Sequence, residues 1–134
     1  MEKKIILGTL GGTVAGMVVA AAIFMGIFGG KMEKWMADNA SCLNDMNPVW
    51  WIVGSLVISL FTAILLHRFG VSTFKGGAIA GAWITLFMVL WYDIMTASTF
   101  KAFTWDWVPF DVIGNTITGA VAGGVIGWIF GKVK

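Results

Sequence analysis

Charge is scarce in this chain, because aspartate, glutamate, lysine and arginine together make up 12% of its 134 residues. An ordinary soluble domain carries about 25% charged residues. Apolar residues instead amount to 58%, and long runs of them contain no charged residue. This composition argues against a soluble domain and indicates a protein surrounded by membrane lipid.

Cysteine and histidine are almost missing, with Cys42 and His67 as the single residue of each type. One cysteine cannot form an intramolecular disulfide, and one thiol with one imidazole cannot make a zinc site. An intermolecular disulfide stays open for Cys42. The sequence also contains no phosphate-binding loop and no serine nucleophile motif. We therefore expect no catalytic residue, no metal centre and no cofactor, and we interpret the chain as a non-enzyme.

Four apolar stretches approach the length of about 20 residues that a helix needs to cross a bilayer. They predict spans at approximately residues 5–28, 49–66, 76–93 and 111–130. The first run is too long for the apolar part of a signal peptide, which has about 7–15 residues, so we interpret it as a retained span. Asn47 with Pro48 is typical of a helix start, Gly70 of a helix stop, and Ser72 or Thr73 of an N-cap. Residues 1–134 are thus predicted to form a single all-α domain of four transmembrane helices.

The basic residues favour one side of the predicted bundle. With four spans, the two termini and the second loop share a side, and six of the nine basic residues fall there. Since lysine and arginine mark the cytoplasmic side, we expect both termini in the cytoplasm of a multi-pass protein of the bacterial inner membrane. Anionic lipid head groups suffice to explain this positive side, and no nucleic-acid partner is expected. The six are Lys3, Lys4, Arg68, Lys75, Lys132 and Lys134.

Glycine recurs at every fourth position within three of the four spans. Small residues at this spacing let two membrane helices approach closely, so we predict a compact bundle with glycine-zipper packing. The pattern does not tell whether these faces meet within one subunit or between subunits. The span at 49–66 is the exception, with only Gly54. The predicted packing residues are Gly8, Gly12, Gly16, Gly77, Gly81, Gly119, Gly123 and Gly127.

Four polar residues near the predicted outer side form a candidate polar or ion site: Asp93, Asp106, Asp111 and Asn115. A carboxylate within a bilayer is costly and usually functional, and oxygen ligands of this kind favour a hard cation such as calcium or magnesium. Two other interpretations stay open for Asp93, namely a solvated acid at the interface and an ion pair with Lys101. Asn115 is equally suited to hydrogen-bonding between helices.

These patterns support two functional hypotheses. The first is a structural or accessory membrane protein that acts through helix packing, either as a homo-oligomer or with another membrane protein. The second is a small channel or transporter for a cation or a small solute, for which Asp93 and Asn115 are the support. An enzyme acting on lipid head groups at the acidic outer side is a third hypothesis, without a catalytic motif behind it.

Overall fold

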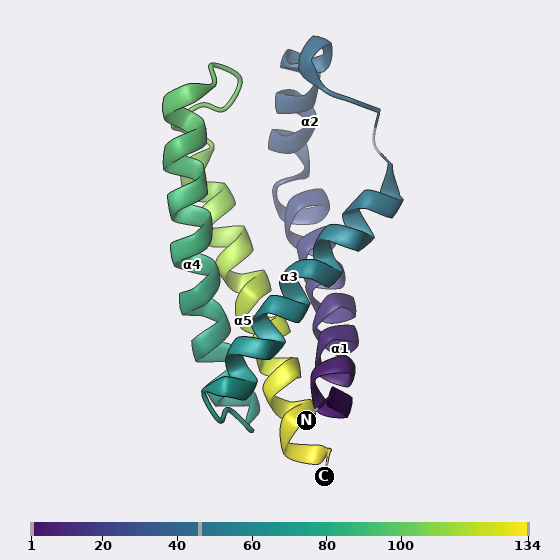
Figure 1. The fold of residues 1–134 in the computed structure, drawn as a ribbon. Coiled ribbons are helices and arrows are strands. Elements are labelled where there is room, and N and C mark those ends of the chain that lie inside the picture. The colour runs from purple at the N-terminus through teal and green to yellow at the C-terminus, as the bar shows by residue number, and fades with distance from the viewer. Residues whose placement is uncertain (1, 46, 134) are drawn as a thin grey trace.

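The computed structural model describes residues 2–45 and 47–133, and this part of the chain is helical throughout apart from its short connections (Figure 1). Met1, Met46 and Lys134 lie outside it, so the last of the six basic residues above is not placed. In chain order the elements are α1 (Glu2–Ala21), the π-helical turn η1 (Ala22–Ile27), α2 (Gly29–Asp38), the 3-10 turn η2 (Ala40–Cys42), α3 (Pro48–Arg68), α4 (Phe74–Thr99) and α5 (Val108–Lys132).

Four of these helical segments are long and apolar enough to cross a membrane, which confirms the predicted number. They are α1 with η1, α3, α4 and α5, and the mean hydropathy of their most apolar windows lies between 1.5 and 2.3. Helix α4 runs six residues beyond Asp93, where the predicted span stops. The hydroxyl groups of Ser98 and Thr99 donate to the Met95 carbonyl at 2.9 and 2.8 Å. Side chains of the last turn thus supply hydrogen-bond donors to a backbone carbonyl near the end of the helix. Asp93 therefore lies inside a helix and not at its end.

The ends of α3 and the start of α4 have the signals that the sequence predicts. The Asn47 side chain accepts a hydrogen bond from the Val49 amide at 3.0 Å. Gly70 adopts a positive φ of 68° just beyond α3, a conformation that few other residues tolerate. Thr73 caps α4 by accepting from the Gly76 amide at 3.1 Å. These three local predictions are confirmed.

Helix α5 lies between α4 and α1, and α3 crosses the bundle diagonally (Figure 1). The most extensive helix contact is that between α4 and α5, followed by the contact between α1 and α5. The buried apolar core gathers where the second half of α3 meets α5, and it consists of Ala63, Leu66, Ile126 and Phe130. This core lies toward the end of the bundle that holds both chain termini (Figure 1).

Helix α2 docks at the opposite end of the bundle. Its Trp35 ring stacks on Trp107 with the ring centroids 6.1 Å apart, and the Trp35 indole N–H donates to the Ala102 carbonyl at 2.9 Å. The Lys31 ammonium group lies 4.0 Å from the centre of the Phe110 ring. Aromatic contacts thus fasten α2 to the start of α5 and to the connection that precedes it.

Candidate functional site

The backbones of α4 and α5 touch along a line of glycines, which we call the α4–α5 seam. A Cβ atom added to Gly77 would lie 3.1 Å from the Cα of Gly127, and one added to Gly81 would lie 3.0 Å from the Cα of Gly123. On the other side of the seam, a Cβ atom on Gly123 would lie 2.9 Å from the Cα of Gly81. No side chain larger than hydrogen has room at these positions.

The seam follows one row of every fourth residue on each helix, and the two rows run in opposite directions. Thr85 lies against Gly119, so each step of four along α4 matches a step of four back along α5. Two further steps bring Val89 level with Asn115 and Asp93 level with Asp111. The row on α4 is Gly77, Gly81, Thr85, Val89 and Asp93; the row on α5 is Gly127, Gly123, Gly119, Asn115 and Asp111.

Asp93 is completely buried, with 0% of its surface exposed. Among the described residues, no hydrogen-bond donor reaches either of its carboxylate oxygens. Its nearest ionisable neighbour is Asp111, whose carboxyl group lies beside it in the first turn of α5. The Asn115 amide group donates to the Asp111 backbone carbonyl at 2.9 Å, one turn further along α5. Three of the four predicted polar residues therefore lie close together. We call Asp93 and Asp111 the acid pair, and Asn115 is the neighbouring amide.

The acid pair has no positive partner in the described part of the chain. The two ion pairs found there lie elsewhere: Lys31 with Asp106 at 3.9 Å and Lys34 with Asp38 at 2.7 Å. An ion pair between Asp93 and Lys101 is not among them, and burial is incompatible with a solvated Asp93. A buried carboxyl group beside a partly buried one, without a counter-charge, is costly, so this place calls for a proton or a cation.

Asp106 lies apart from the acid pair. Its side chain is 75% exposed in the connection before α5, facing Lys31. A hydrogen bond from the Thr104 hydroxyl, aided by the nearby lysines, holds the pKa of the Asp106 carboxyl below its ordinary value. Of the four predicted polar residues, Asp106 is therefore the one that the fold does not bring to the seam.

The glycines of α1 contact α5 in a different way. A Cβ atom on Gly8 would lie 2.6 Å from the Phe130 ring, and one on Gly12 would lie 2.7 Å from the Ile126 side chain. Gly16 faces the Ala122 methyl group at 3.6 Å. Large side chains of α5 thus enter notches on α1, whereas backbone meets backbone at the α4–α5 seam. All eight glycines predicted to pack face a neighbouring helix of the same chain.

The π-helical turn η1 contacts the first half of α5 at Gly114, and sequence reasoning missed this turn. Its Ile23 and Phe24 side chains contact Gly114, where an added Cβ atom would lie 2.6 Å from the Phe24 ring. Gly114 directly precedes Asn115. Single π-helical turns inside longer helices are frequent at functional sites. Hydropathy and small-residue spacing carry no signal for a π turn, and Gly26 is the only local irregularity in the segment.

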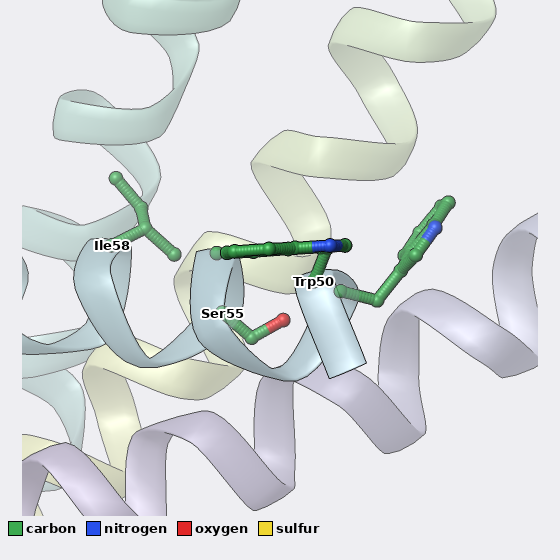
Figure 2. A pocket seen from close by; sticks show the side chains of 5 residues that line it. Trp50, Ser55 and Ile58 are labelled. Carbon is green, nitrogen blue, oxygen red and sulfur yellow. The ribbon is translucent and has the colours of Figure 1, made fainter. Parts of the chain in front are cut away.

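The first half of α3 presents an open apolar face. A shallow depression of about 480 Å³ lies there, and all the side chains that line it come from this one helix (Figure 2). Trp50 is 71% exposed, and a Cβ atom on Gly54 would meet nothing within 4 Å. The depression lacks converging polar groups, so it offers no chemistry. Its lining residues are Trp50, Trp51, Gly54, Ser55 and Ile58.

Among the described residues, no cluster of three or more histidine, cysteine, aspartate or glutamate side chains is present. A metal ion would therefore find only the two carboxyl groups of Asp93 and Asp111 with the Asn115 amide, and no arrangement for a larger cofactor accompanies them. A scan against protein-family models, a search of curated proteins and a search of solved structures each found no match to this chain.

Proposed function

We propose that this chain is a small integral membrane protein of the bacterial inner membrane, with α1 and η1, α3, α4 and α5 crossing the bilayer. The length and hydropathy of these helices support the proposal, as do the many large apolar side chains on the outside of the bundle. The two termini lie at one end (Figure 1). Since Lys3, Lys4 and Lys132 belong to that end, the positive-inside rule assigns it to the cytoplasm.

In this proposal the protein has a structural or accessory role without catalysis, and it acts through helix packing. The observation that supports this role is that α5 packs against two helices through glycines. It meets α4 along the α4–α5 seam and α1 at the notches. Contacts of this kind are how membrane helices gain van der Waals energy, since lipid gives them no hydrophobic drive to associate. We interpret this arrangement as a glycine zipper within one subunit.

A second copy of the chain is the partner that we propose for the open face of α3. Gly54 and Ser55 form a low point between bulky neighbours, and small residues are what close helix approach requires. In a two-fold dimer one patch meets itself, so the tryptophans of one copy would fill the depression of the other.

Cysteine crosslinking tests this dimer in native membranes. In a Cys42→Ser background, Ser55→Cys is expected to form a disulfide-linked dimer on oxidation. The control is Ile79→Cys, at an exposed position on α4, and it should stay monomeric. Equal crosslinking of both variants, or none with Ser55→Cys, would reject the proposed interface.

A small channel or transporter for a cation is the second candidate function, and the acid pair is the observation that favours it. An ionisable residue within a membrane helix is by default a functional candidate. Proteoliposomes carrying the purified protein should pass a cation, and Asp93→Asn should abolish that flux without loss of assembly. Asp106→Asn is the matched control, because Asp106 lies outside the seam.

A further inference from the structure

We propose that Asp93 and Asp111 bind one hard divalent cation, of the calcium or magnesium class, between α4 and α5. The inference rests on the second proposed function, to which it adds a site and a class of ligand. It starts from the juxtaposition of two carboxyl groups, one of them fully buried and without a donor among the described residues.

Electrostatics requires something positive at this place. Burying an unpaired carboxylate is costly, and placing two of them side by side adds repulsion. Lys101 is the basic residue closest in sequence to Asp93, and neither it nor any other described basic residue pairs with the acids. A divalent cation would cancel both charges and satisfy the oxygens that lack a donor.

The chemistry of the ligands selects a hard cation. Both acids and the neighbouring Asn115 offer oxygen, which calcium and magnesium prefer. The single cysteine and the single histidine lie elsewhere: Cys42 is exposed after α2, and the His67 ring packs against Phe130 near the chain termini. The thiolate and imidazole ligands that zinc and copper favour are therefore not at this site.

The fold holds the two acids in place without a binding loop. Because the glycines bring the backbones of α4 and α5 into contact, they fix the register that sets Asp93 level with Asp111. Ligand side chains on packed helices are positioned more precisely than ligand side chains on loops. Asp111 is only partly buried, so a cation would reach Asp93 from the side of Asp111. A bound cation would also tie α4 to α5.

Cation binding to the full-length protein in detergent micelles tests the site directly. Calorimetric titration with calcium chloride and with magnesium chloride, at constant pH in a choline chloride background, should show one saturable site for at least one of them. Asp93→Asn should weaken this binding about 10-fold or more, since even the loss of an outer-shell partner costs 10- to 100-fold. Asp106→Asn should bind as the wild type does.

Two measures keep the result interpretable. Asp111→Asn gives a second variant should Asp93→Asn fail to fold, which circular dichroism and gel filtration would reveal. The unfolding temperature should rise with the cation in the wild type and stay unchanged in both seam variants. Equal binding by all variants would overturn the proposal, as would no binding of either divalent cation at millimolar concentration. A response to pH alone would replace the cation with a proton and also overturn it.

The site and the transport function can fail separately. Cation binding without flux through liposomes would support the site and reject transport. Flux that persists in Asp93→Asn, together with no measurable binding, would reject the site and leave transport standing. Sodium chloride in place of choline distinguishes a divalent site from a general one, since equal competition by sodium at equal concentration would overturn the assignment to a divalent cation.

Discussion

Gly81 and Asp93 share one row of α4, three steps of four residues apart, and both face α5. The row changes character along its length, from glycine through Thr85 and Val89 to a carboxylate. The first part brings the backbones together, and the last part places a charge where they meet. One face of α4 therefore carries both the glycines that pack against α5 and Asp93, the one buried acid among the described residues.

Enlarging a seam glycine should separate α4 from α5. A Cβ atom in Gly123→Ala would lie 2.9 Å from the Gly81 Cα, and backbone cannot move aside as a flexible side chain can. We expect a loss of about 1–3 kcal/mol in the free energy of unfolding, measured by reversible unfolding in mixed micelles.

Gly54→Ala is the control, because an added Cβ atom there meets nothing within 4 Å. Alanine favours a helix over glycine by up to about 1 kcal/mol, so this variant should be as stable as the wild type or more so. A similar loss for both variants would contradict the close approach at Gly123.

Truncating the residue that fills the notch of α1 should also destabilise the bundle. Ile126 is completely buried and its side chain occupies the space above Gly12. Ile126→Ala should cost about 2–5 kcal/mol of unfolding free energy, since it leaves a cavity in the core. Ile117→Ala on the exposed side of α5 should change it by less than about 0.5 kcal/mol. Equal effects in the same unfolding assay would remove Ile126 from the core.

Helix α2 is held mainly by aromatic contacts, which gives it a separate test. Trp35→Ala removes both the stacking on Trp107 and the hydrogen bond to the Ala102 carbonyl. An aromatic pair contributes about 0.5–1.5 kcal/mol, so amide hydrogen exchange in α2 should become roughly 2- to 10-fold faster. Exchange in α5 beyond its first turns should be unchanged.

Trp50→Ala is the matched control for α2, because Trp50 lies on the open face of α3. Exchange in α2 should not respond to this change. Protection of α2 that survives Trp35→Ala would show that another contact, such as that of Lys31 with the Phe110 ring, holds the helix.

The sequence could predict the four long helices because a run of about 20 apolar residues by itself indicates a helix long enough to cross a bilayer. It could also predict the ends of α3, since Asn47, Pro48 and Gly70 act through local backbone geometry. The predicted span stops at Asp93 whereas α4 continues to Thr99, because hydropathy marks the apolar part of a helix and not its last turns. A charge normally marks the edge of a span, and only the neighbouring helix shows that this one is buried.

The membership of Asp93, Asp111 and the seam glycines in two rows of every fourth residue is visible in the sequence. Which helix faces which is not, because that requires the register between α4 and α5. Thr85 was overlooked for the same reason: its hydroxyl becomes notable only beside Gly119. The π-helical turn was beyond reach, since no residue pattern specifies the extra residue that it contains.

The orientation of the whole bundle can be tested with its own cysteine. Cys42 is exposed in the segment between α2 and α3, which the basic residues assign to the outer side. A membrane-impermeant maleimide should label it in intact cells. In a Cys42→Ser background, Lys75→Cys should react only after the membrane is opened. The opposite pattern would invert the proposed topology.

Helix α1 meets its main partner, α5, more than a hundred residues later in the chain. Synthesis proceeds at about 5–20 residues per second, so the notches at Gly8 and Gly12 stay uncovered for on the order of ten seconds while the rest of the chain emerges. Helices α4 and α5 are joined by a short connection and can pair almost at once. In each newly made molecule α1 can meet α3 early, but its contact with α5 forms only at the end of synthesis. During that interval its glycine notches are open to other newly made helices.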